Sequence, residues 1–157
     1  MIKITDKLIS RLANKAKTAK RGRVNYNFHK DYSEKVQRLL NVAGQGSYVR
    51  PHKHENPDKT ETFILLKGKV LVLEFGLDRK VSDYFILDLQ KGNLGVEISP
   101  GVWHSFISLS EGSCVYEVKE GPYNPKIDKK FAPWAPQERS KEAGLFNKKI
   151  LSDLNIK

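Results

Sequence analysis

Regularly spaced turn residues constrain the fold of this chain more than any other feature of its sequence. Between residues 37 and 119, Gly, Pro, Asn and Asp interrupt the chain at short intervals. They bound eight short runs suited to β-strands, at 37–43, 47–53, 61–67, 69–75, 83–89, 94–98, 103–109 and 113–119. No intervening stretch is long enough for the helical crossover that joins parallel strands. The pattern predicts an all-β fold, a single antiparallel jelly roll or barrel.

The flanks of this β region have a different character. Residues 5–16 place apolar side chains at helical spacing behind Thr5, a favourable N-cap, so we expect a short amphipathic helix there. Residues 17–35 predict a loop with one brief strand. From residue 120 onward the chain is rich in Pro and aromatic residues and is expected to extend along the barrel, with an end that is helical or partly disordered. The predicted organisation is a lead-in over 1–36, a barrel over 37–119 and an extension over 120–157.

Composition limits the class of protein. A chain of 157 residues has the size of one domain. It has no apolar run of 18 residues, so we expect no transmembrane helix and no membrane partner. The first ten residues lack the apolar segment of a secretory signal, and the single cysteine, Cys114, cannot form an internal disulfide. These features predict a cytoplasmic protein, and Cys114 has no neighbour in sequence that would activate it as a nucleophile.

The net charge of +10 is unevenly distributed along the chain. Residues 1–45 hold 11 Lys and Arg against 3 Asp and Glu, whereas residues 46–119 hold 9 against 10. The densest cluster, at 15–23, is either a phosphate-binding surface or a solvated helix end and loop. We favour the second interpretation because no basic strand studded with aromatic residues accompanies it, so nucleic-acid binding is not expected.

The stretch SYVRPHKHENPDKTETFILLKG, residues 47–68, places two histidines one residue apart and a glutamate after them. Residues i and i+2 of a strand share a face, so His52 and His54 are expected to project together. Glu61 begins the next strand-like run, and His104 begins a later one. Three imidazoles and a carboxylate are typical ligands of a divalent first-row metal, and four ligands leave positions open on a six-coordinate ion. The alternative is a set of ordinary surface and edge-strand residues.

These residues resemble the two sequence motifs of the cupin family. Gly46, His52-x-His54, Glu61 and Gly68 are similar to the first motif, and GVEISPGVWH, which ends at His104, is similar to the second. The gap from His54 to Glu61 is longer than the usual cupin spacing. The resemblance implies a small β-barrel with a metal held by His52, His54, Glu61 and His104.

More narrowly, the chain is similar to the WbuC family of cupin-fold metalloproteins over most of residues 1–138. The similarity rests on the 47–68 stretch and on VQRLL, WHSF, VYEVKEGPYNP and DKKFAPWAPQE. It implies a bacterial protein encoded among surface-polysaccharide genes. It implies no particular reaction.

A barrel of this kind holds its ligand in the lumen. Strand alternation places Arg50 and Tyr48 on the face of His52, so we expect Arg50 to bind a carboxylate or phosphate and Tyr48 to contact a sugar ring. His29 is a candidate for the rim of the site. Either Tyr116 or Glu117 faces inward, and an inward Glu117 is a possible general base.

The expected cofactor is one divalent transition metal ion, Fe, Zn, Ni or Mn, and the expected ligand is a small, anionic, sugar-type molecule. These expectations favour a metal-dependent isomerase or epimerase that acts on a sugar or sugar nucleotide in surface-polysaccharide biosynthesis. Two alternatives stay open: a non-catalytic, metal-organised module that binds a small molecule or carbohydrate, and an iron-dependent dioxygenase. A homodimer is expected by analogy with the fold.

Overall fold

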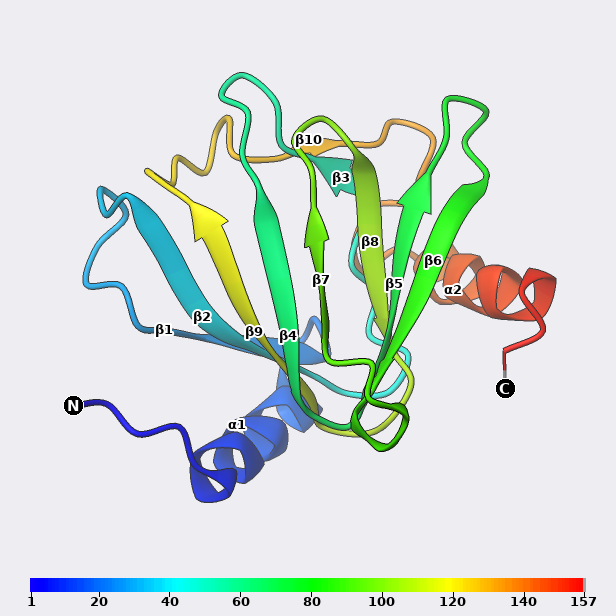
Figure 1. Cartoon of the computed structure of the whole chain (residues 1–157). Helices are drawn as coiled ribbons and strands as arrows, with labels where there is room; N and C mark the ends of the chain where they lie inside the picture. The colour runs from blue at the N-terminus through cyan, green and yellow to red at the C-terminus, as the bar shows by residue number, and fades with distance from the viewer. Residues whose placement is uncertain (157) are drawn as a thin grey trace.

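The computed structural model describes residues 1–156, which form two facing antiparallel sheets. In spatial order the first sheet contains β1 (Arg23–Asn27), β2 (Val36–Ala43), β9 (Ser113–Glu120), β4 (Glu61–Lys67) and β7 (Gly95–Ile98). The second contains β10 (Lys130–Phe131), β3 (His52–Lys53), β8 (Trp103–Ser108), β5 (Lys69–Phe75) and β6 (Val81–Asp88). Figure 1 shows the two sheets leaning together at one end and spreading apart at the other. The predicted all-β antiparallel fold is confirmed as a jelly-roll sandwich.

The first sheet is covered on its outer face by helix α1 (Asp6–Thr18). The hydroxyl of Thr5 caps this helix by accepting a hydrogen bond of 3.2 Å from the backbone N–H of Leu8. Apolar residues of the helix pack against outward side chains of β2 and β9, including Leu40 and Cys114. The helix predicted over residues 5–16 is confirmed, and its burial stabilises the sheet that carries Glu61.

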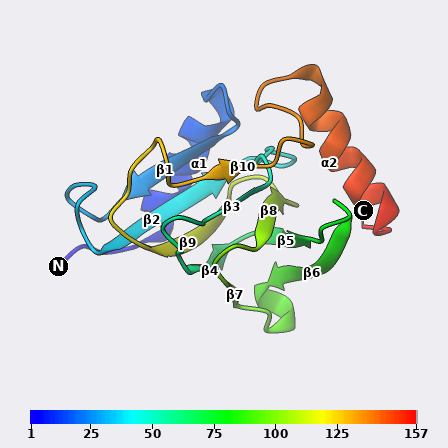
Figure 2. The ribbon, with the colours of Figure 1, turned by 90° about the horizontal axis from the view of Figure 1, so that it is seen from above.

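The second sheet is covered on its outer face by the C-terminal extension (Figure 2). The extension passes through β10 and ends in helix α2 (Lys141–Asp153). The ring of Trp134 lies 5.2 Å from that of Phe75, and both belong to an apolar cluster with β5, β8 and α2. None of the helices described over residues 1–156 combines the length and apolarity needed to cross a bilayer.

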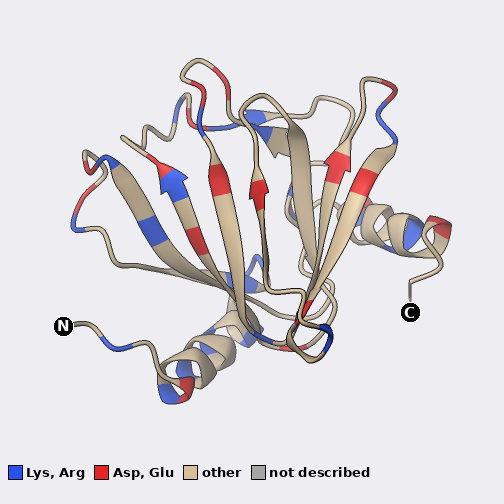
Figure 3. Cartoon of the chain, in the orientation of Figure 1, with Lys and Arg blue, Asp and Glu red and all other residues tan. Residues whose placement is uncertain are grey.

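The space between the sheets is divided into an apolar part and a polar part. Val70 and Val72 of β5 point inward and pack with Phe63 and Phe106 in the main core. Toward the spreading end, polar residues occupy the inward positions of β1, β2 and β9. Figure 3 shows charged residues on several strands there. Glu61 opens β4 and Glu117 lies on β9, and both are buried. A packed core therefore supports a polar lumen.

Most predicted strands agree with observed strands to within two residues, but the run at 47–53 does not. Only His52 and Lys53 form a regular strand, and Tyr48 makes one isolated bridge with Ile107. Pro51 has no N–H to contribute to a ladder, which explains the interruption. The run at 83–89 also ends early, because Leu89–Lys91 forms the 3₁₀ turn η1.

Candidate metal centre

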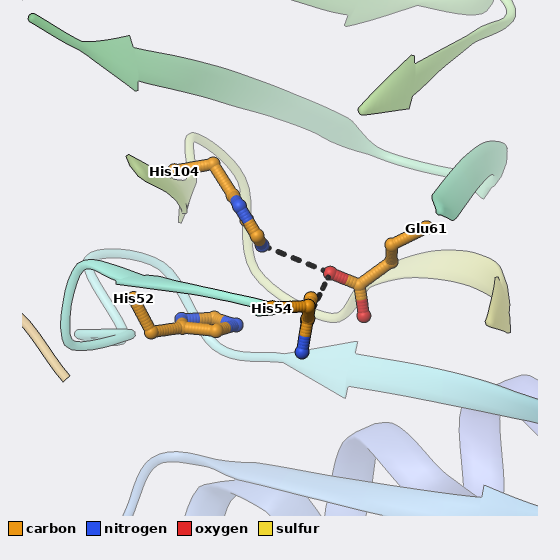
Figure 4. Close-up of side chains that lie close together, drawn as sticks. All are labelled: His52, His54, Glu61 and His104. Carbon is orange, nitrogen blue, oxygen red and sulfur yellow. Dashed lines mark hydrogen bonds and ion pairs between the residues drawn. The ribbon is translucent and has the colours of Figure 1, made fainter. Parts of the chain in front are cut away.

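Four side chains from both sheets meet at the inner end of the lumen (Figure 4). His52 on β3 pairs directly with His104 on β8, His54 lies just beyond β3, and Glu61 opens β4 in the opposite sheet. All four are buried, and one nitrogen or oxygen atom from each lies within 4.8 Å of the others. Ligands bonded to one ion at about 2.1 Å are at most about 4.2 Å apart, so this cluster is close to the dimensions of a metal site.

The backbone fixes the orientation of all three imidazole rings. The Nδ1 atoms of His52 and His104 lie 3.0 and 2.9 Å from backbone carbonyls two residues earlier in the chain. Nδ1 of His54 contacts the carbonyl of Asp128 in the C-terminal extension. A carbonyl only accepts hydrogen bonds, so each Nδ1 carries a proton and donates. The Nε2 atom of a neutral ring then keeps its lone pair, the form that binds a metal.

These lone pairs converge on a carboxylate. Nε2 of His104 lies 3.0 Å and Nε2 of His54 3.4 Å from the same oxygen of Glu61. Nε2 of His52 is buried and forms no hydrogen bond with residues 1–156. Lone pairs that face a carboxylate repel it unless a positive charge lies between them. The donor set therefore fits a divalent transition metal ion.

Burial and neighbouring charges favour the metal-binding forms of two of these groups. Burial lowers the pKa of His52 well below its usual value, and the charge of Lys129 lowers it further. Burial raises the pKa of Glu61, but its close contacts with His104 and His54 and the charge of Lys119 outweigh this and hold the pKa well below its usual range. His52 is therefore neutral and Glu61 ionised near neutral pH, as metal binding requires.

The cluster faces two adjoining cavities. An inner chamber of about 40 Å³ is lined by three of the four donor residues, His52, Glu61 and His104. A larger cavity of about 500 Å³ shares His52, Glu117 and Lys129 with this chamber and has the volume of a small-molecule pocket. The remaining lining residues of the larger cavity are Arg21, Arg23, Asn25, Asn27, His29, Tyr32, Gln37, Leu39, Val49, Arg50, Lys119, Tyr123, Phe131 and Glu138.

Two of the three residues predicted to bind a ligand line this cavity, and the third does not. Arg50 and His29 are lining residues. The hydroxyl of Tyr48 instead donates to the carbonyl of Pro136 at 2.8 Å, and its ring packs against Phe146 of α2. The prediction for Tyr48 assumed strict strand alternation through residues that are not a regular strand, and the structure places this tyrosine among the packing residues of the extension.

Glu117 faces inward, whereas Tyr116 packs in the outer cluster beneath α1. Asn41 donates to a carboxyl oxygen of Glu117 at 3.2 Å. Burial, followed by the charge of Glu61, raises the pKa of Glu117 to about 8. Glu117 is thus a largely protonated carboxyl group that lines both cavities at neutral pH.

The sequence did not indicate several of the residues that line the larger cavity. Arg21 and Arg23 belong to the basic cluster at 15–23, which was interpreted as a solvated helix end and loop. Arg23 is in fact buried, donates to the carbonyl of Tyr48 at 2.6 Å and pairs with Glu138. The signal for it was the polar alternation along RVNYN, in which Arg23, Asn25 and Asn27 share one face.

A buried ion network joins the extension to the metal ligands. The carboxylate of Asp128 pairs with Lys119 at 2.6 Å and with Lys59 at 2.9 Å. The backbone carbonyl of the same residue accepts the hydrogen bond from His54. Asp128 therefore positions a histidine of the cluster and neutralises two buried ammonium groups.

We expect Asp128→Ala to lower the free energy of unfolding by about 3–5 kcal/mol, because it leaves two buried lysines without their carboxylate. The lysines lower the pKa of Asp128 in spite of its burial, so its contribution is present above the unfolded-state pKa and is lost as the pH falls through the lower folded-state value. Urea denaturation from pH 7 down to pH 3 measures both effects.

Asp153→Ala, which removes an exposed ion pair with Lys149, is the control and should change the free energy of unfolding by less than about 0.5 kcal/mol. Equal effects of the two substitutions would contradict the assignment.

Comparisons with known proteins place this geometry in context. Residues 4–87 match the family described as "Domain of unknown function (DUF6016)". No curated protein matches the chain significantly. Among solved structures, the capsular polysaccharide assembling protein CapF from Staphylococcus aureus is 21% identical with a TM-score of 0.56, over 68% of this chain and 28% of CapF.

Two further structures share the fold. Oxalate oxidase, solved with the substrate analogue glycolate, is 21% identical with a TM-score of 0.52, over 74% of this chain and 58% of that one. Oxalate decarboxylase from Lactobacillus farciminis is 13% identical with a TM-score of 0.50, over 80% of this chain and 33% of that one. At these identities the likeness shows the fold alone, a cupin jelly roll, and this chain spans less than two thirds of each of these proteins.

Proposed function

This chain belongs to the DUF6016 family of domains of unknown function, and from its cupin fold and donor cluster we propose that it is a metal-dependent isomerase or epimerase for a small anionic sugar or sugar nucleotide. The observation that carries the proposal is the meeting of three histidine lone pairs and one carboxylate at the inner end of a cavity lined by cations. A purely structural metal site has no need of a cavity through which a ligand can reach the metal.

In this proposal, the ligands of the metal are His52, His54, Glu61 and His104. When bound, it supplies Lewis-acid polarisation of a carbonyl or hydroxyl oxygen. Arg50 binds the anionic part of the ligand, His29 lines the path to it, and the apolar core behind the cluster excludes water. Glu117 lines both cavities and is the carboxyl group placed to exchange a proton with the ligand.

The fold neighbours and the sequence similarity support a proposal for the cellular setting. The name of CapF, a capsular polysaccharide assembling protein, agrees with the bacterial surface-polysaccharide setting that the similarity to WbuC implies. We propose the same setting here, with a cytoplasmic homodimer as the working form. Two other activities compete with the isomerase. A non-catalytic binding module would leave its ligand unchanged, and an iron-dependent dioxygenase would require iron and oxygen.

Elemental analysis of the purified chain is expected to find about one Fe, Zn, Ni or Mn ion per chain, with the ion located between the four side chains by anomalous scattering at the metal edges. Removal of the ion by a chelator should lower the melting temperature, and return of the ion should restore it. Metal present at 100 times its dissociation constant stabilises the folded state by about 2.7 kcal/mol. A chain that takes up none of these ions and melts identically with and without them would overturn the proposal.

A further inference from the structure

The larger cavity has an excess of positive charge. Its lining contains five cationic side chains, those of Arg21, Arg23, Arg50, Lys119 and Lys129. It contains only two carboxyl groups, those of Glu117 and Glu138. Burial of this many like charges is unfavourable unless they are paired. The pairing of each cation therefore shows which of them is available to a ligand.

Three of the five cations are already paired within the protein. Arg21 and Arg23 share the carboxylate of Glu138. Lys119 pairs with Asp128 at 2.6 Å, and its ammonium also lies 5.5 Å from the ring centre of Tyr123. These groups shape the wall of the cavity but have their partners.

Lys129 and Arg50 differ from the other three. Within residues 1–156, Lys129 has no ion pair, although it is half-buried and lines both the inner chamber and the larger cavity. Arg50 donates one N–H to the carbonyl of Ala132 at 2.8 Å, but its buried Nε has no acceptor among the described residues. Among the described residues, two cationic side chains without a carboxylate partner thus line the same cavity beside the metal cluster.

The backbone on both sides of Lys129 is held in place by its neighbours. Its neighbour Asp128 is fixed by two lysines and by His54, and its other neighbour, Lys130, pairs with Glu55 and begins β10. The backbone at Lys129 is therefore fixed on both sides, and its side chain starts from a defined point and lines both cavities.

The other side of the cavity suits the uncharged part of a sugar. The rings of Tyr32 and Tyr123 meet edge to face, with centres 4.8 Å apart. Asn27 and Gln37 add amide groups to the same lining. Aromatic faces and amides are suited to the C–H and hydroxyl groups of a sugar ring. The inner chamber of about 40 Å³ admits only a few water-sized groups, so a whole sugar ring fits only the larger cavity.

We propose that Lys129, together with Arg50, binds the anionic group of the ligand and makes the site selective for acidic sugars, whether sugar acids or sugar phosphates, over neutral ones. This inference rests on the proposed function and deepens it by naming the residue that selects the anionic group of the substrate. The residue comes from the C-terminal extension, outside the two motifs that carry the metal ligands.

Isothermal titration calorimetry of the zinc-loaded chain tests the proposal with three probes: D-galacturonate, galactose 1-phosphate and D-galactose. The intact chain should bind at least one of the two acidic sugars more tightly than D-galactose. Lys129→Met should weaken that binding about 10- to 100-fold, the usual loss for a charge-assisted hydrogen bond, and should leave the affinity for D-galactose unchanged. Lys129→Arg should recover part of the loss.

Lys130→Met, which changes an exposed lysine paired with Glu55, is the matched control and should bind all three probes as the intact chain does. The acidic probe that loses more affinity identifies the anionic group.

Metal analysis of every variant separates failure of this inference from failure of the proposed function. A metal-bound chain that binds neither acidic sugar, or binds D-galactose equally well, would overturn the inference alone. Lys129→Met with full metal content and unchanged affinities would also overturn it. A chain that takes up no metal but still loses acidic-sugar binding on Lys129→Met would overturn the proposed function and support the inference.

Discussion

His104→Ala is expected to reduce bound metal at least tenfold relative to the unaltered chain. Nε2 of His104 lies 3.0 Å from the Glu61 carboxylate in a fully buried cluster, and the substitution offers no replacement donor. Loss of a residue that merely orients a ligand typically lowers metal affinity 10- to 100-fold, so loss of a ligand should cost at least as much. Elemental analysis of protein purified without chelator measures the metal-to-protein ratio. His52→Ala, which removes the donor paired with His104 across β3 and β8, should have an effect of the same size.

His29→Ala provides a matched control for these two substitutions. His29 is also buried and lines the larger cavity, but its Nδ1 contacts the backbone of Arg38 and its side chain is not part of the cluster. Its removal should leave the metal content unchanged. If His104→Ala stays folded by circular dichroism and keeps full metal content, His104 is not a ligand and the proposed centre is wrong.

The local parts of this fold were predictable because they depend on local patterns. The runs at 61–67 and 69–75 match β4 and β5 to the residue, since each alternates or repeats apolar side chains between clear turn signals. The joint projection of His52 and His54 also follows from spacing alone. The pairing of His52 with His104 depends on contacts between distant segments, and only the resemblance to cupin motifs indicated it.

The lining of the cavity was less predictable because it depends on register between distant strands. Glu117 pairs with Leu39 on β2 and with Phe63 on β4, and these pairings decide that it faces inward instead of Tyr116. Lys129 lies in an extended segment with no strand period to indicate its direction. The predicted position of Tyr48 in the cavity was wrong for the opposite reason. It assumed the two-residue period of a strand, but Pro51 interrupts the ladder there.

Truncation after Glu120 is expected to cause aggregation or loss of the folded state. The extension covers an outer face of β5 and β8 that contains Leu71, Leu73 and Ile107, all almost fully buried. Exposure of each such side chain costs about 1.5–3 kcal/mol, and a whole domain is stable by only about 5–15 kcal/mol. The truncation also removes Asp128 from its two lysines. Gel filtration and thermal unfolding of the truncated chain measure the outcome.

Two point substitutions separate packing from the mere absence of a tail. Trp134→Ala keeps the chain length but removes a ring that contacts Phe75 and Phe146, and should lower the free energy of unfolding by about 3 kcal/mol. Leu145→Ala changes an exposed residue of α2 and should alter it by less than about 0.5 kcal/mol. A soluble, monodisperse truncated chain with an unchanged melting temperature would show that the extension is dispensable to the barrel. If the extension stabilises the sheet, Trp134→Ala should lie between the two other variants in stability, because it removes one contact of the covering layer and retains the rest.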